Sequence, residues 1–225
     1  MEFSGLQKTS LLDYPDKVAS VLFTPGCNLH CAYCHNWEIA TNPQPPFLQE
    51  ATVLEILERR KKYIDAIVIT GGEPCIHKEL PKFLVKLKGQ GFFVKIDTNG
   101  FYPEVLEECL NHVDYIALDI KTCLEKYSQL GGQDTSNLQK SIELLKMGKT
   151  PYEFRTTIVP EIVTLQDIEQ IGKLSEGSKA HALQQFISEN APEAHYQKLQ
   201  RYTPEIIKEF ADKLSRYTEK VILRI

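Results

Sequence analysis

Three cysteines have the clearest chemical potential in this sequence. Cys27, Cys31 and Cys34 lie within eight residues and follow the spacing Cys-x3-Cys-x2-Cys. A thiolate is a strong, soft ligand for iron or zinc, so one short loop can hold a metal centre. Closed zinc sites and most iron–sulfur clusters take four protein ligands. Three thiolates on a four-iron cluster would therefore leave one iron open to bind a small molecule.

A zinc loop is the alternative interpretation of the same cysteines. Its fourth ligand would be His35 or a distant cysteine, and spacing alone does not separate zinc from iron–sulfur. The other cysteines are scattered: Cys109 follows an apolar helical stripe and is expected in the core, and Cys75 follows a Gly-Gly-Glu-Pro run near the proposed site. No second cluster is expected.

Composition and length are those of one globular domain spanning residues 1–225. Apolar residues make up 42% and charged residues 25%, and the net charge is −4, from 26 basic and 30 acidic residues. The one basic run, Arg59 to Lys62, lies at a predicted helix end, so no nucleic-acid partner is expected. No signal-like or membrane-spanning segment stands out, which predicts a cytoplasmic protein without a membrane partner.

Strands and helices alternate along the chain, which favours parallel strand–helix–strand units. We expect an α/β fold, an incomplete (β/α)6-type barrel, with a flat doubly wound sheet as the alternative. Residues 3–15 are read as a strand or loop and residues 36–50 as a loop. The expected strands span 18–24, 66–70, 92–97, 114–119, 153–159, 182–187 and 221–225. The expected helices span 52–63, 79–89, 103–111, 136–147 and 165–174, with a last helix capped by Thr203.

Polar residues follow the predicted strands, and the carboxyl ends of parallel strands meet at one edge. The first strand leads into the cysteine loop and the second into Gly71-Gly72-Glu73. The glycines would let a ligand approach the backbone, and Glu73 can pair with an ammonium group; a simple tight turn is the alternative.

Two acids, Asp97 and Asp119, end the next two strands. Paired acids on one rim call for a ribose, a cation or Lys121 between them. Lys121 lies on the same strand face as Asp119, and either Lys121 or Arg155 can hold a carboxylate.

The cysteine loop resembles the cluster loop of the radical S-adenosylmethionine (SAM) superfamily, in which an aromatic residue, here Tyr33, precedes the last cysteine. The segments Tyr33–Asn36, Gly71–Pro74, Asp97–Gly100 and Asp119–Lys121 resemble motifs of the activating enzymes of glycyl-radical enzymes. The segments Gly5–Pro15, Tyr152–Thr157 and Leu183–Phe186 are similar to the longer form of anaerobic ribonucleoside-triphosphate reductase activating proteins.

This resemblance implies a [4Fe–4S] cluster on Cys27, Cys31 and Cys34, with SAM on its open iron. One electron would cleave SAM to a 5′-deoxyadenosyl radical, which abstracts hydrogen from a glycine of a partner, here anaerobic ribonucleotide reductase. A flavodoxin or ferredoxin-type donor would supply the electron.

The resemblance also implies roles for individual residues. Glu73 with Gly71 and Gly72 would meet the SAM amino group, and the backbone of Tyr33 and His35 would contact adenine. Asp97, Thr98 and Asp119 would hold a monovalent cation. Pyruvate formate-lyase activating enzymes carry a histidine near the sixth strand's end. Here Gln185 is the suggested substitute.

Two other functions stay open at this point. One is the same radical chemistry on a small molecule or on a different glycyl-radical enzyme. The other is a non-enzymatic zinc module, which would leave the polar strand ends unexplained.

Overall fold

An eight-stranded sheet organises the chain, whose residues 1–225 are all described by a computed structural model. The strand order is β10-β9-β8-β7-β6-β5-β3-β2, and only β2 is antiparallel to its neighbour. The strands are β2 (Gly5–Ser10), β3 (Ala19–Thr24), β5 (Ala66–Gly71), β6 (Phe93–Thr98), β7 (Tyr115–Asp119), β8 (Tyr152–Ile158), β9 (His181–Gln185) and β10 (Val221–Arg224).

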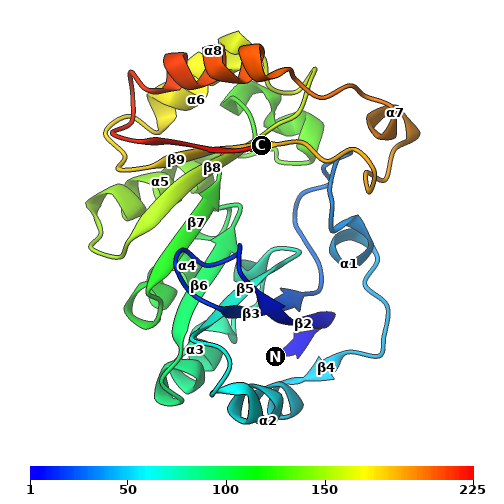
Figure 1. The fold of residues 1–225 in the computed structure, drawn as a ribbon, viewed down its shortest axis with the longest axis vertical. Coiled ribbons are helices and arrows are strands. Elements are labelled where there is room, and N and C mark those ends of the chain that lie inside the picture. The colour runs from blue at the N-terminus through cyan, green and yellow to red at the C-terminus, as the bar shows by residue number, and fades with distance from the viewer.

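The helices lie on the outside of this curved sheet (Figure 1). Six of them connect successive parallel strands: α2 (Glu50–Arg60), α3 (Leu80–Gly89), α4 (Pro103–Cys109), α5 (Ser136–Met147), α6 (Leu165–Leu174) and α8 (Pro204–Leu214). Parallel strands follow one another in chain order without the reversal of a doubly wound sheet. The sheet ends at β2 and β10 without closing, so the predicted incomplete (β/α)6-type barrel is confirmed, with a seventh parallel strand added.

Strand alternation separates an apolar outer face from a polar interior. In β6, Val94 and Ile96 belong to the main hydrophobic core beneath the helices. Lys95 and Asp97 point the other way and pair with each other inside the barrel. The same β6 sequence therefore builds the core and supplies charged groups to the interior.

The N-terminal third holds more regular structure than predicted. Residues 3–15 contain the second residue of β1 (Glu2–Phe3) and the whole of β2, and β1 pairs with β4 (Leu48–Gln49). The loop predicted for residues 36–50 was wrong in part, because α1 (Trp37–Thr41), β4 and the first residue of α2 fall within it. Pro43, Pro45 and Pro46 confine the irregular stretch to the residues between α1 and β4.

Several helix and strand ends differ from the predictions by a few residues. The α2 helix starts at Glu50, so Thr52 lies inside it and does not cap it. Glu50 instead pairs with the terminal amino group of Met1 and with Lys86. Thr203 occupies the N-cap position of α8 but forms no side-chain cap, whereas Thr164 caps α6 in a capping box with Asp167.

Two further elements end before their predicted carboxyl ends. α4 ends at Cys109, and a 3-10 turn, η2 (Leu110–His112), follows it. β9 ends at Gln185, two residues before the predicted Ile187.

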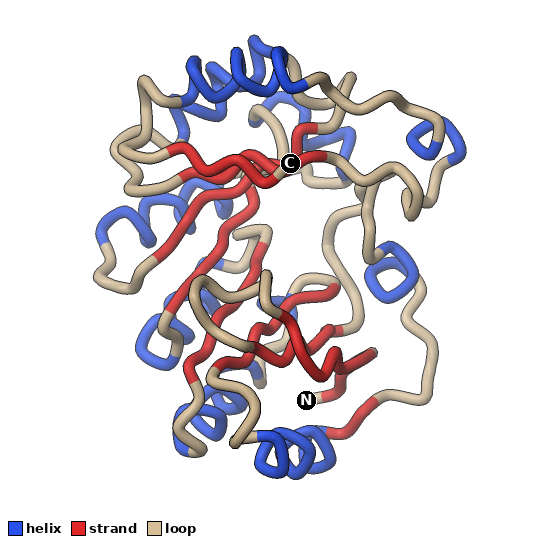
Figure 2. The backbone as a smooth tube through the Cα atoms, in the orientation of Figure 1, coloured by secondary structure: helices blue, strands red, loops and turns tan.

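Short helices and loops flank the open side of the sheet. Figure 2 shows α1 and the small helix α7 (Ala194–Gln197) on the side opposite the outer helices, joined to their neighbours by long loops. The cysteine loop leads into α1, and the segment after β9 carries α7. No helix combines the length and apolar character needed to cross a bilayer.

Candidate active site

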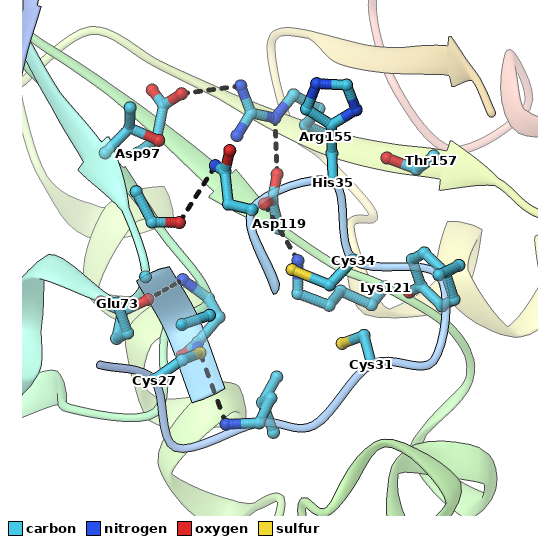
Figure 3. A pocket seen from close by; sticks show the side chains of 18 of the residues that line it. Cys27, Cys31, Cys34, His35, Glu73, Asp97, Asp119, Lys121, Arg155 and Thr157 are labelled. Carbon is cyan, nitrogen blue, oxygen red and sulfur yellow. Dashed lines mark hydrogen bonds and ion pairs between the residues drawn. The ribbon is translucent and has the colours of Figure 1, made fainter. Parts of the chain in front are cut away.

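A pocket of about 290 Å³ lies at the carboxyl ends of the parallel strands. Its wall contains all thirteen residues predicted from the sequence: Cys27, Cys31, Tyr33, Cys34, His35, Gly71, Gly72, Glu73, Asp97, Thr98, Asp119, Lys121 and Arg155. The fold therefore brings residues from five strand ends to one place, as Figure 3 shows for many of them.

The three clustered cysteines share one loop and are all partly exposed to the pocket (Figure 3). The loop is held by backbone hydrogen bonds, including His30 N to Leu130 O at 2.8 Å and Cys34 N to Cys31 O at 3.0 Å. Burial raises the pKa of each thiol, to about 11 for Cys31, and the positive charge of Lys121 opposes the rise. The other cysteines are buried, so the prediction that Cys109 lies in the core is confirmed.

The donor set fits a cluster better than a single ion. No group of three or more His, Cys, Asp or Glu side chains converges closely enough to hold one metal ion. A four-iron cluster is larger than one ion and can span three separated thiolates. His35, the proposed fourth ligand of a zinc site, is exposed and its Nε2 lies 3.3 Å from the Asn190 amide. In addition, the Tyr33 hydroxyl is buried without a hydrogen-bond partner beside these thiols.

The glycine pair brings the end of β5 against the cysteine loop. Glu73 N donates to Gly26 O at 2.8 Å, one residue before Cys27. A Cβ on Gly72 would lie 1.8 Å from Gly26 O, and Gly71 has a φ of 111°. Only glycine permits this approach and this conformation. The two glycines therefore fix the position of the cysteine loop, whether or not they also contact a ligand.

Glu73 lines the pocket but its carboxylate is already engaged. The side chain is 1% exposed and accepts hydrogen bonds from Thr98 Oγ1 and Asn99 N, each at 2.6 Å, and from Cys75 N at 2.9 Å. Burial raises its pKa, and these donors oppose the rise. Glu73 braces the ends of β5 and β6, and its pairing with an ammonium group stays a prediction.

Five charged side chains form a connected group in the barrel interior, which we call the charged rim: Lys95, Asp97, Asp119, Lys121 and Arg155. Arg155 donates to Asp119 Oδ1 at 2.5 Å and to Asp97 Oδ2 at 2.9 Å. Lys95 donates to Asp97 Oδ1 at 2.6 Å, and Lys121 to Asp119 Oδ2 at 3.2 Å. Three cations face two carboxylates, which leaves one positive charge to be balanced by an anionic ligand.

The charged rim keeps its members ionised. Burial alone would raise the pKa of both Asp97 and Asp119, but Arg155 and the adjacent lysines hold both below the usual range. Conversely, the two acids keep the pKa of Arg155 well above its ordinary value. Arg155 thus lies between the paired acids, at the place for which the sequence suggested a ribose, a cation or Lys121. A monovalent cation on Asp97, Thr98 and Asp119 stays a prediction, because protein cations already occupy both carboxylates.

Sequence reasoning missed Lys95 and Asn99. Lys95 lies two residues before Asp97 in a buried strand, and a lysine in that position should have indicated an interior ion pair. Asn99 donates to Asn28 Oδ1 at 2.8 Å and lies 3.7 Å from Cys27 Sγ, so it joins the end of β6 to the cysteine loop. Gln185 lines the pocket, but its amide donates to Tyr202 O at 3.0 Å, so its substitute role stays a prediction.

Aromatic side chains close the pocket on the open side of the barrel. The Tyr33 ring packs edge-on against Phe186 and tilted against Tyr196, at centroid distances of 6.4 Å and 6.2 Å. Phe186 follows β9 and Tyr196 lies on α7. These contacts join the cysteine loop to the last third of the chain.

The Radical SAM superfamily model matches residues 21–174 of this chain. A putative glycyl-radical enzyme activating enzyme of Methanocaldococcus jannaschii is 35% identical over 98% of this chain and 95% of its own. A pyruvate formate-lyase-activating enzyme of Staphylococcus epidermidis is 33% identical over 69% of this chain and 67% of its own.

The chain therefore belongs to the radical SAM superfamily of enzymes. Within it, the chain falls in the branch of glycyl-radical enzyme activating enzymes. Membership implies a [4Fe–4S] cluster and SAM as cofactors and a glycyl-radical enzyme as partner.

Solved structures agree on the fold. QueE from Escherichia coli superposes with a TM-score of 0.62 at 19% identity, over 99% of this chain and 93% of its own. SuiB of Streptococcus suis bound to its precursor peptide SuiA gives a TM-score of 0.71 at 13% identity, over 91% of this chain and 48% of its own.

Proposed function

We propose that this enzyme activates an anaerobic ribonucleoside-triphosphate reductase by generating its glycyl radical. When bound, the cluster and SAM supply a one-electron reductive cleavage and a hydrogen-abstracting radical, the hard chemistry of the reaction. The observation that carries the proposal is the meeting of three partly exposed thiols and a rim with one surplus positive charge in a single pocket.

The protein groups would divide the work of binding. Cys27, Cys31 and Cys34 would ligate the cluster. Lys121 and Arg155 would attract the carboxylate of SAM, because the charged rim lacks one negative charge. The backbone at Gly71 and Gly72 would contact its amino group, with Glu73 fixing that loop. The backbone of Tyr33 and His35 would border the adenine.

The finer assignments belong to the same proposal. We expect a flavodoxin or ferredoxin-type donor and a cytoplasmic location. The segments similar to the long-form reductase activating proteins, above all Gly5–Pro15, support the reductase as partner. A monovalent cation would share Asp97 and Asp119 with Arg155, Lys95 and Lys121, which already pair with both acids.

A second partner class has its own support. Pyruvate formate-lyase-activating enzymes are among the similar proteins, and the Staphylococcus epidermidis example is 33% identical. The sixth-strand region reads Gln184-Gln185-Phe186, without the histidine that the sequence comparison led us to expect in that group. The absence of that histidine favours the anaerobic ribonucleoside-triphosphate reductase as the partner.

Partner mixing under anaerobic conditions tests the proposal. The reconstituted enzyme, SAM and dithionite are mixed with an anaerobic ribonucleotide reductase or with a pyruvate formate-lyase, each taken from an organism that also carries a close relative of this chain. Electron paramagnetic resonance should show a glycyl signal with the reductase and none with the lyase. A signal only with the lyase would transfer the assignment to that partner. Full iron loading without 5′-deoxyadenosine in any mixture would contradict the radical chemistry.

A further inference from the structure

Tyr33 has a fixed ring and an unexplained hydroxyl group. Its side chain is 8% exposed, and its ring is held by Phe186 and Tyr196. Those contacts use only the ring, so phenylalanine would pack equally well. The hydroxyl is buried and has no hydrogen-bond partner in the protein. A buried hydroxyl left in this state costs stability, which makes a purely structural reason for tyrosine inadequate.

Among the groups near this hydroxyl, the Cys31 sulfur is the acceptor without a strong donor of its own. Asp119 already accepts hydrogen bonds on both carboxylate oxygens, from Arg155 and Lys121. The Tyr127 hydroxyl accepts from Lys121 N at 2.9 Å. No hydrogen bond of normal geometry joins the Tyr33 hydroxyl to the Cys31 sulfur, but the two groups are close enough for the hydroxyl to lower the pKa of the Cys31 thiol through a weak hydrogen-bond contact. The negative charge that Cys31 carries as a thiolate is also, after burial, the largest influence that raises the pKa of Tyr33.

Sulfur becomes a better acceptor when it carries negative charge. A neutral thiol is a weak acceptor, which is consistent with a hydroxyl that faces Cys31 without a hydrogen bond of normal geometry. A ligating cysteine is a thiolate, and hydrogen bonds to charged acceptors are shorter and stronger. Hydrogen bonds to cluster sulfurs stabilise the more negative, reduced state and so raise the reduction potential.

We propose that Tyr33 is a positioning residue whose hydroxyl donates a hydrogen bond to the Cys31 sulfur once that sulfur ligates the cluster, raising the cluster's reduction potential. This inference rests on the proposed function, because it requires the cluster. It assigns the hydroxyl a task beyond the backbone contact to adenine expected at this residue. In the protein without a cluster the hydroxyl is a stability cost, and in the loaded protein it becomes a donor with a partner.

The test compares Tyr33→Phe with the natural protein in both states. Without the cluster, the variant should be equally stable or more stable to urea, because it loses an unsatisfied polar group. With the cluster, it should bind the same amount of iron but show a more negative midpoint potential. We expect the equilibrium constant for reduction to fall on the order of tenfold, about 59 mV for one electron.

Tyr196→Phe is the matched control, because it removes a hydroxyl from the same aromatic cluster at a half-exposed position on α7. It should leave the potential unchanged. An unchanged potential in Tyr33→Phe, or an equal shift in both variants, would overturn the inference. Lower stability of cluster-free Tyr33→Phe would also overturn it, since the hydroxyl would then have a partner already.

The proposed function is decided separately, by the iron content and spectrum of the natural protein. If that protein assembles no iron–sulfur cluster, the proposed function fails and the hydrogen bond fails with it. If the cluster assembles and only the shift is missing, the proposed function stands and this inference alone is wrong.

Discussion

Arg155 and Asp119 face each other across neighbouring strands, and one ion pair joins them. They are register partners in the parallel pairing of β8 with β7, and Arg155 Nε lies 2.5 Å from Asp119 Oδ1. The same guanidinium reaches Asp97 on β6. One side chain thus ties the carboxyl ends of three strands together at the pocket wall.

Replacing Arg155 should therefore destabilise the fold as well as the site. Arg155→Ala leaves the buried Asp97 and the partly buried Asp119 with two lysines, and removing one partner of a buried ion pair costs about 3–5 kcal/mol. Urea unfolding would measure this cost. Arg201→Ala, which breaks an exposed pair with Glu189, is the control and should cost at most about 1 kcal/mol. Similar losses in both variants would show that the charged rim is not a structural tie.

Gly72 should tolerate no side chain. The Cβ of Gly72→Ala would meet the Gly26 carbonyl oxygen, so the cysteine loop must move. We expect a loss of about 1–3 kcal/mol or more, together with reduced iron uptake. Gly89→Ala is the matched control, because nothing lies within 4 Å of a Cβ there and α3 gains a better helix former. Urea unfolding and iron analysis check both variants, and normal iron uptake by Gly72→Ala would contradict the proposed contact.

The three clustered cysteines should differ from the buried ones in iron binding. Serine at Cys27, Cys31 or Cys34 should abolish stable loading, whereas Cys109→Ala should keep about four iron atoms per chain, since Cys109 lies in the core. Iron analysis and visible absorbance after anaerobic reconstitution measure how much cluster each variant binds. Equal loading in all of these variants would remove the basis of the site.

His181 should make the protein sensitive to mild acid. Burial lowers the pKa of His181 from 6.5 to about 3, while the ring contacts Thr156 and Ser175. The unfolded chain then binds one more proton than the folded chain below pH 6.5, so stability falls as the pH falls towards 3. The slope should be about 1.4 kcal/mol per pH unit from this group.

Urea unfolding at several pH values between 6.5 and 5 measures that slope. His181→Gln removes the titration and should flatten the dependence, even if the variant is less stable at every pH. His195→Gln serves as the control, because His195 is exposed and should leave the slope in place. An unchanged slope in His181→Gln would assign the acid sensitivity to other groups.

Local patterns in the sequence predicted much of this structure. Apolar strands followed by polar or glycine residues indicated parallel strands with a shared functional edge, because an apolar run and the residue types that end it are both local features of the sequence. The long helices were predicted within a few residues, since their apolar stripes repeat with the helical period. The short α1, β1 and β4 were missed, because elements of two to five residues carry almost no periodic signal.

The sequence by itself determined the chemistry of the site: three thiols in one loop, a glycine pair and the acids and bases at successive strand ends. Tertiary structure alone decided how those groups are paired. It placed Arg155 between Asp97 and Asp119, added Lys95, used the Glu73 carboxylate as a brace and set Phe186 and Tyr196 against Tyr33. The physical reason is range: spacing within a loop or strand fixes local geometry, whereas ion pairs and packing join residues that only the curvature of the sheet brings together.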